Sequence, residues 1–221
     1  MNCLLAAATI KEIIPFMNHY RKQVLLPAHL NIDVLITGIG LTATSYSLAR
    51  YFGHKRPDLV IQAGLAGCFD KNFSLGTVVA VKQDTVADQS VMEKKKLLTL
   101  FDLGLMKQNQ FPYAKGWLRN NNSNLLKSCR LKSVNGITVN QVSTSKQMIK
   151  FYQRKFNPVI ESMEGAALHY VCLMEKIPFL QVRSISNYAG ERNKQKWNLK
   201  ESIINLNNKL ISILETLNTQ Q

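Results

Sequence analysis

The chain has 221 residues, of which 46% are hydrophobic and 19% charged, and its formal net charge is +14. These values are typical of a globular protein and exclude a disordered or fibrous chain. No apolar run approaches the ~18 residues of a membrane-spanning helix. The apolar start has no basic region before it, so we predict no signal peptide. The length fits a single domain over residues 1–221.

Six short runs rich in Val and Ile predict buried strands: Cys3–Ala8, Asp33–Thr37, Leu59–Ala63, Thr77–Val81, Ile137–Val142 and Phe179–Ile185. Four segments predict helices: Leu41–Phe52, Lys146–Phe156, Met163–Glu175 and Leu199–Leu217. Strands that alternate with helices indicate an α/β fold with a mainly parallel or mixed sheet. The stretch from Gln89 to Asn135 is rich in turn formers, which predicts a long excursion packed beside the sheet.

The four cysteines are scattered through the chain without a CxxC pair. This spacing indicates neither a disulfide framework nor a zinc site, and we predict no bound metal. Each cysteine is interpreted as a small core residue. Without an export signal, the reducing cytoplasm is the expected compartment.

The surplus of positive charge is concentrated between residues 93 and 155. Such a field attracts anions, so nucleic acid, an anionic membrane and an acidic small substrate are candidate partners. No helix-turn-helix, zinc finger or aromatic RNA-binding motif accompanies the charge. We therefore predict no nucleic-acid or membrane partner, and keep a basic nucleic-acid-binding module as an alternative.

The run from Gly38 to Ala43 matches G-x-G-x-x-A between a predicted strand and a predicted helix, which is the pattern of dinucleotide sites. An earlier strand opens the chain, however, so this is not the first strand-to-helix turn. Asp58, near the spacing of the ribose-binding acid, begins its strand instead of ending it. We therefore predict a tight turn here, and neither NAD nor another cofactor.

Polar and small residues follow several predicted strands, at the edge where open α/β sheets bind ligands. Glu12 comes just after the first strand, and Gly64-Leu65-Ala66-Gly67 ends the third, where small residues let backbone N–H groups approach a ligand. Each feature alone is also typical of an ordinary turn or helix start.

Two carboxylates, Glu161 and Glu164, flank Ser-Met at the entry to an apolar helix. The helix dipole is a sufficient structural reason for acids there, whereas a functional carboxylate could hold a pair of vicinal hydroxyls. The last strand ends in Arg183-Ser184-Ile185-Ser186-Asn187. Polar groups in such a buried setting need partners.

Taken in order, these pieces resemble the nucleoside phosphorylase and nucleosidase superfamily. The matching stretches are TGIG, PDLVIQAGLAG, LGTVV, ESMEGAALHYVC and IPFLQVRSISN. Within the superfamily the chain is most similar to the futalosine hydrolases, through Phe101–Leu105, Phe111–Leu118 and Ile185–Trp197. The resemblance implies a three-layer α/β sandwich, with a central mixed, mainly parallel sheet flanked by helices. It also implies removal of hypoxanthine from futalosine, a nucleoside that carries a benzoate, in the alternative menaquinone pathway.

The resemblance further implies roles for individual residues. Glu12 would activate water, Arg183 would lie beside that water, and Asn187 would hydrogen-bond the purine N7 edge. The substrate-binding residues would be Met163, Glu164 on the ribose hydroxyls, Ser186 orienting Asn187, the turn residues Gly64, Ala66 and Gly67, and Thr144. Two positions depart from the adenine-specific relatives: Leu65 replaces a serine, and Thr144 replaces a base-stacking aromatic residue.

Three alternatives within the resemblance stay open. A phosphorylase would need a phosphate clamp of arginines, but Gln62 stands before the GLAG turn, which favours water as the acceptor. A nucleosidase of the methylthioadenosine/S-adenosylhomocysteine type would act on another nucleoside. A catalytically dead relative would only bind one. The resemblance also implies a homo-oligomer and a small-molecule nucleoside substrate.

Overall fold

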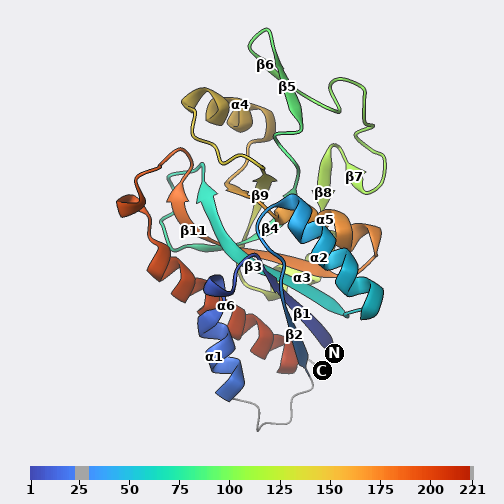
Figure 1. Ribbon diagram of the computed structural model, residues 1–221, viewed down its shortest axis with the longest axis vertical. Coiled ribbons are helices and arrows are strands. Elements are labelled where there is room, and N and C mark those ends of the chain that lie inside the picture. The colour runs from blue at the N-terminus through green and yellow to red at the C-terminus, as the bar shows by residue number, and fades with distance from the viewer. Residues whose placement is uncertain (23–29, 220–221) are drawn as a thin grey trace.

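The structure is a computed structural model that describes residues 1–22 and 30–219. Its centre is a nine-stranded mixed sheet in which β2, β1, β3, β10, β9, β4, β8 and β7 follow one another and β11 pairs with β3 and β4 (Figure 1). The strands are β1 Asn2–Ala7, β2 Asn31–Ile36, β3 Leu59–Cys68, β4 Val78–Asp84, β7 Tyr113–Ala114, β8 Trp117–Arg119, β9 Lys132–Thr138, β10 Ile160–Ser162 and β11 Phe179–Tyr188.

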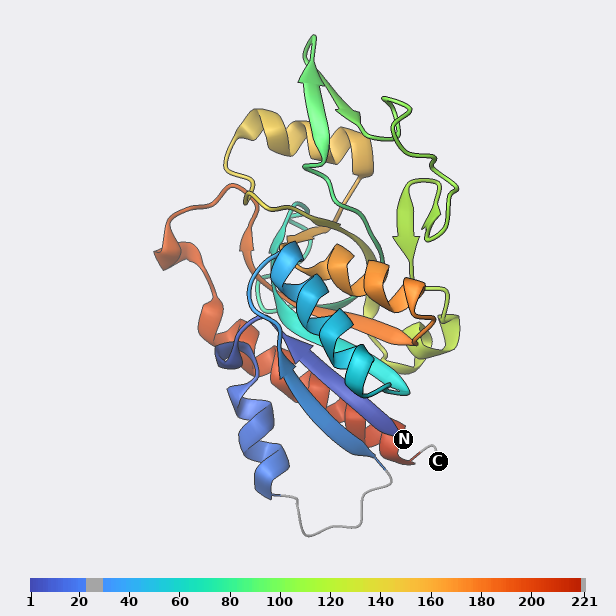
Figure 2. The same cartoon turned by 45° about the vertical axis from the view of Figure 1, so that its right-hand side comes forward.

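Helices cover both faces of this sheet, as Figure 2 shows. The helices are α1 Ile14–Lys22, α2 Leu41–His54, α3 Ser123–Ser128, α4 Lys146–Phe156, α5 Gly165–Met174 and α6 Leu199–Thr219, with short 3₁₀ helices η1 Ile10–Glu12 and η2 Lys194–Lys196. Since side chains alternate along a strand, Leu5 of β1 packs with Leu206 and Leu210 of α6, whereas Leu4 packs with Leu48 of α2 and Leu168 of α5. The predicted three-layer α/β sandwich is thereby confirmed.

The longest strands, β3 and β11, run parallel through the middle, and their carboxyl ends reach the same edge of the sheet (Figure 1). Their register pairs Arg183 with Gly64 and, after a bulge, Asn187 with Gly67. Strand β1 lies on the other side of β3, also parallel, so Ala7 pairs with Ala63. This pairing brings the motifs that follow β1, β3 and β11 together at one edge.

The stretch between β4 and α4 differs from its prediction. Strands β7 and β8 extend the sheet, and β9 runs through its interior from Lys132 to Thr138, between β4 and β10. The prediction of a strand at Ile137–Val142 is therefore largely wrong, because β9 ends at Thr138. The predicted excursion beside the sheet up to Asn135 is also wrong, because β7, β8 and the first residues of β9 are part of the sheet. The first two residues of β9, Lys132 and Ser133, are polar and exposed. The strand is thus defined by its hydrogen-bonded neighbours and has no apolar run at its start.

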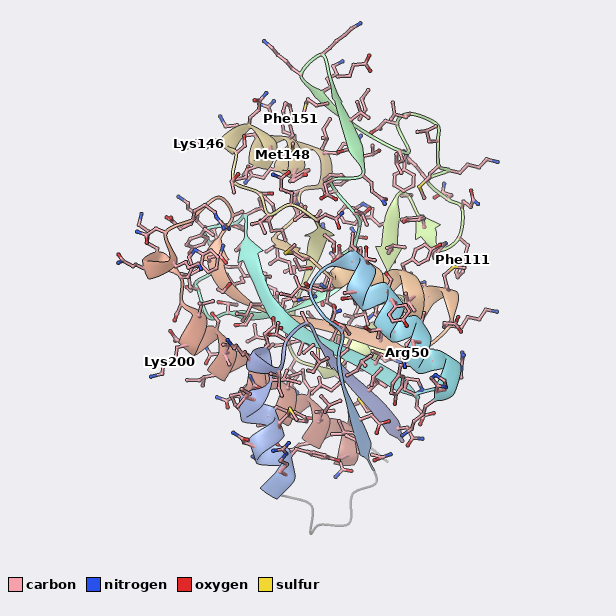
Figure 3. All side chains as sticks on the ribbon, viewed as in Figure 1. Arg50, Phe111, Lys146, Met148, Phe151 and Lys200 are labelled. Atoms are coloured by element: carbon pink, nitrogen blue, oxygen red, sulfur yellow. The ribbon has the colours of Figure 1, made fainter. Side chains whose placement is uncertain are left out.

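The hairpin of β5 Ser90–Glu93 and β6 Lys96–Thr99 projects beyond the sheet, next to α4 (Figures 1 and 2). Basic side chains point outward from distant elements, such as Lys146 on α4 and Lys200 on α6 (Figure 3). All four cysteines are buried and free, which confirms their interpretation as core residues. Among residues 1–22 and 30–219, no helix combines the length and the apolar character needed to cross a membrane.

Candidate active site

A cavity of about 350 Å³ opens at the carboxyl ends of the central strands. This volume lies in the range of ~300–1,000 Å³ that is usual for small-molecule sites. Seven of the ten predicted site residues line it: Glu12, Ala66, Gly67, Met163, Glu164, Ser186 and Asn187. A second hollow, of about 460 Å³ and lined partly by Lys82 and Lys132, contains none of the ten.

Glu12 is held in the cavity wall by three donors. Its Oε2 accepts the backbone N–H of Thr9 at 2.9 Å and the Thr9 hydroxyl at 3.1 Å, and its Oε1 accepts the N–H of Leu65 at 3.1 Å. The backbone carbonyl of Glu12 accepts the side-chain amide of Asn207 on α6 at 2.8 Å. These contacts connect the turn after β1 to β3 and α6, so the carboxylate has a defined position.

Glu164 is oriented by two charged or polar contacts at the start of α5. Its Oε1 accepts the backbone N–H of Gly40 at 3.1 Å, and its Oε2 faces Nη1 of Arg183 at 3.3 Å. The other terminal nitrogen of Arg183 donates to Oε1 of Gln62 at 2.7 Å. Arg183 is only 1% exposed and does not line the cavity, so it orients Glu164 from behind the wall.

Gly64 leaves room for both charged groups. A Cβ at this position would lie 2.4 Å from Nη1 of Arg183 and 3.1 Å from Oε1 of Glu12. Any larger residue would displace the guanidinium, which explains a glycine here. Gly64 does not itself line the cavity. Because it has no side chain, the Arg183 guanidinium and the Glu12 carboxylate can both lie close to its backbone.

The Asn187 amide has a fixed orientation. Ser186 donates its hydroxyl to Asn187 Oδ1 at 2.8 Å, and Asn187 Nδ2 donates to the carbonyl of Tyr188 at 3.1 Å. An amide nitrogen carries two hydrogens, so one N–H of Asn187 remains for a ligand in the cavity. Ser186 thus lies where the sequence predicts an orienting group.

Thr144 is exposed and does not line the cavity. The cavity-lining residues closest to Thr144 in the sequence are Val139 and Val142. They follow β9, at the place where the sequence predicts the end of a strand. A base in this site would therefore contact aliphatic side chains from this segment.

Sequence reasoning missed a group of residues on the side of the cavity near η1 and α6. Two cations, Lys11 and Arg192, line the cavity there together with the apolar side chains of Trp197, Leu199 and Ile203. The Arg192 guanidinium lies 5.7 Å from the centre of the Trp197 ring, and the indole N–H donates to the carbonyl of Glu191 at 3.0 Å. The sequence contained a signal for two of these residues, because Arg192 and Trp197 belong to Ile185–Trp197, one of the stretches that carry the resemblance.

The glycine-rich turn after β2 has a structural role. Gly38 and Gly40 have φ values of 82° and 92°, a region that glycine adopts easily, and the N–H of Gly40 binds Glu164. Asp58, at the opposite end of the sheet, accepts the N–H of Asn2 at 2.7 Å. The predicted tight strand-to-helix turn is confirmed.

Comparison with known families identifies the family of this chain. The model of the phosphorylase superfamily matches residues 10–217. The chain belongs to the phosphorylase superfamily. Its match extends over the elements that carry Glu12, Glu164 and Asn187.

Individual relatives narrow this assignment. A futalosine hydrolase from Thermus thermophilus is 31% identical over 172 residues, covering 76% of this chain and 75% of the relative. A 5'-methylthioadenosine/S-adenosylhomocysteine nucleosidase from Buchnera aphidicola is 25% identical over 194 residues, covering 84% and 79%. The native structure of futalosine hydrolase from Helicobacter pylori superposes with a TM-score of 0.79 at 17% identity, covering 97% of both chains. The Thermus relative confirms the resemblance to futalosine hydrolases, and the two sequence relatives together confirm the predicted enzyme class, hydrolysis of an N-glycosidic bond. The superposed structure confirms the fold.

Proposed function

We propose that the protein is a futalosine hydrolase that releases hypoxanthine and leaves dehypoxanthine futalosine. The observation that carries this proposal is the convergence of Glu12, Glu164 and Asn187 on one cavity at the carboxyl ends of the strands. We further propose that residues 1–221 form one nucleosidase domain, and that it acts as a homo-oligomer in the cytoplasm, in the alternative menaquinone pathway.

Cleavage of an N-glycosidic bond passes through an oxocarbenium-like sugar, and each group has a part in reaching it. The free N–H of Asn187 donates to N7 and stabilises charge on the leaving base, a contribution of about 10²–10³ in rate for such a donor. Glu164 holds the ribose hydroxyls, with Met163 beside it on the cavity wall. Glu12 takes a proton from the attacking water as general base.

Water is favoured over phosphate as the acceptor. A phosphate clamp needs arginine side chains that are free to form paired hydrogen bonds. The arginine next to Glu12 is Arg183, which is buried and already bound to Glu164 and Gln62. The cations that line the cavity, Lys11 and Arg192, belong to the group near η1 and α6.

The acceptor can be tested directly by incubating the pure protein with futalosine, with and without inorganic phosphate. We expect hypoxanthine and dehypoxanthine futalosine at the same rate in both samples, identified by mass spectrometry. Methylthioadenosine and S-adenosylhomocysteine, tested in parallel, should be cleaved more slowly. A phosphorylated sugar product would contradict hydrolysis, and faster cleavage of methylthioadenosine would contradict futalosine as the substrate.

The group near η1 and α6 supports futalosine over methylthioadenosine. An aromatic carboxylate combines an apolar ring with a negative charge, and this part of the cavity combines Trp197, Leu199 and Ile203 with the cations Lys11 and Arg192. Arg192 is the better placed partner for a carboxylate next to a ring, since its guanidinium already lies over an aromatic face. The benzoate of futalosine matches this combination.

Replacing Arg192 with Ala should raise KM for futalosine by about tenfold, because a charged hydrogen bond is lost, with little change in kcat. The measurement compares futalosine with its methyl ester, which has no negative charge. The ester should be a poor substrate for the wild type and should be unaffected by the substitution. Arg50→Ala, which removes an exposed arginine of α2, is the matched control. An equal rise in KM for acid and ester would show that Arg192 does not bind the carboxylate.

A further inference from the structure

A cluster of buried polar side chains lies against the first turns of α5, behind the residues that line the cavity. The cluster comes from the end of β4, the end of β9, α5 and β11, and each side chain is 0% exposed and absent from the cavity lining: Asp84, Thr138, His169 and Gln181. Burying polar groups is costly. The proposed mechanism uses none of the four.

Thr138 connects α5 to Asp84 through two hydrogen bonds. Its hydroxyl oxygen accepts the backbone N–H of Ala166 at 2.7 Å, and the same hydroxyl donates to Oδ1 of Asp84 at 2.9 Å. A hydroxyl carries one proton, so the direction of this chain is fixed. The chain that starts at α5 must therefore end on an acceptor, which is the Asp84 carboxylate.

Gly165 lets the start of α5 lie directly against Asp84. A Cβ at this position would lie 2.2 Å from Oδ2 of Asp84 and 2.2 Å from Nε2 of Gln181. Any side chain would displace these two groups, so the contact explains why a glycine follows Glu164. The N–H of Gly165 is bound separately, by the hydroxyl oxygen of Ser162 at 3.2 Å.

Glu164 is the N-cap residue of α5, but its side chain does not cap the helix. Its carboxylate contacts Gly40 and Arg183 at the cavity wall instead, and the first turn of α5 contains no acidic residue. A helix N-terminus needs acceptors for its free N–H groups and is stabilised by a nearby negative charge. Thr138 and Asp84 supply both from behind the wall, which leaves the carboxylate of Glu164 for a ligand.

Packing alone does not account for a carboxylate at position 84. Asp84 forms no ion pair with any residue that the structure describes. Burial raises the pKa of Asp84 to about 6, whereas Thr138, Gln181 and the positive charge of Arg183 act to lower it. An apolar side chain of similar size would avoid the cost of burial, so the carboxylate indicates a role beyond packing.

We propose that Asp84, acting through Thr138, holds the first turn of α5 and thereby positions Glu164 on the ribose hydroxyls. Ala166, the residue bound by Thr138, is two positions beyond Glu164, and the carbonyl of Glu164 accepts the N–H of Ala167 at 3.0 Å. A shift of this turn therefore moves Glu164. Asp84 is a positioning residue, behind the cavity wall. The inference rests on the proposed function in that Glu164 is taken to bind the ribose hydroxyls.

The test measures how strongly binding depends on those hydroxyls. Inosine and 2',3'-dideoxyinosine carry the same base and differ only in two ribose hydroxyls. Their dissociation constants are measured by titration calorimetry in a Glu12→Gln background, which slows cleavage. This starting protein should bind inosine tighter by about tenfold or more, as expected for hydrogen bonds to a charged group.

Thr138→Val breaks the chain and should lower this ratio of dissociation constants by about fivefold, the value of one neutral hydrogen bond. Thr138→Ser keeps the hydroxyl and should restore most of the ratio. Asp84→Leu removes the acceptor and should act like Thr138→Val, whereas Asp84→Asn keeps an acceptor oxygen and should lower the ratio less. Combining Asp84→Leu with Thr138→Val should have no further effect, because both break one chain. Thr216→Val, near the end of α6, is the matched control.

A ratio is the informative quantity, because a merely structural loss would weaken both nucleosides alike. An unchanged ratio in Thr138→Val, or effects that multiply in the double variant, overturns the proposal. A starting protein that binds both nucleosides equally, or neither, also overturns it. Melting temperatures identify the folded variants, and the comparison of Thr138→Val with Thr138→Ser and Asp84→Asn decides the outcome if Asp84→Leu does not fold.

Hydrolysis of futalosine is measured separately on the protein with its native Glu12. A protein that fails to cleave futalosine but shows the expected ratios would refute the proposed substrate and leave the role of Asp84 standing. A protein that cleaves futalosine but keeps its ratio in Thr138→Val would refute the role of Asp84 alone.

Discussion

Replacing Glu12 with Gln should lower kcat by about 10²–10⁴-fold, the usual contribution of a positioned acid–base group, while the protein stays folded. Glutamine has nearly the same shape, but its amide cannot take a proton from water. The carboxylate accepts three hydrogen bonds from Thr9 and Leu65. An NH₂ group can replace only one of its oxygens, so the loss of stability should be about 0.5–1.5 kcal/mol for each bond lost.

The measurement is kcat with futalosine, together with the melting temperature by circular dichroism. The control is Glu175→Gln, which changes a carboxylate outside the cavity in the same way. A Glu12→Gln enzyme with kcat within about threefold of the wild type would show that Glu12 is not the base.

Replacing Arg183 with Met should lower the free energy of unfolding by about 3–5 kcal/mol, the cost of leaving one partner of a buried ion pair uncompensated. Arg183 is 1% exposed and Glu164 is 5% exposed, so water does not replace the lost contact. Oε1 of Gln62 loses its donor as well. Activity should also fall, since the guanidinium that orients Glu164 is gone.

A double variant separates the charge effect from general damage to packing. Adding Glu164→Gln to Arg183→Met removes the orphaned charge, so stability in urea unfolding should partly recover, whereas activity should not. Arg50→Met is the surface control and should change stability by no more than about 0.5 kcal/mol. If the double variant is no more stable than Arg183→Met alone, the two side chains are not energetically coupled.

Local sequence patterns were sufficient for much of the fold. The helix predicted at Lys146–Phe156 has those bounds in the structure, and the helix predicted from Leu41 ends two residues later, at His54. The central strands were predicted from short apolar runs, because both faces of the sheet are covered by helices and a doubly covered strand has few polar residues. Strand β9 escaped this reasoning, since its polar start carries no such run.

The edge of the sheet that holds the site was also predictable, whereas the position of each side chain around the cavity was not. Parallel strands end at the same edge, so Glu12 after β1, the turn at the end of β3 and Asn187 at the end of β11 had to lie near one another. Nothing local showed that Arg183 lies behind the wall, that Thr144 is not part of the cavity lining, or that Lys11 and Arg192 line the same cavity.

The sequence by itself therefore determined the type of those elements that carry a clear apolar run or helical period, and the edge of the sheet where the chemistry is placed. Side-chain periodicity and strand direction are local properties, and they follow from neighbouring residues alone. Only the tertiary structure decided which polar groups are paired and which are left free. Glu161 and Asn187 meet across Gly67 because β10 and β11 both pair with the end of β3, and the pairing of distant strands depends on how the whole chain packs.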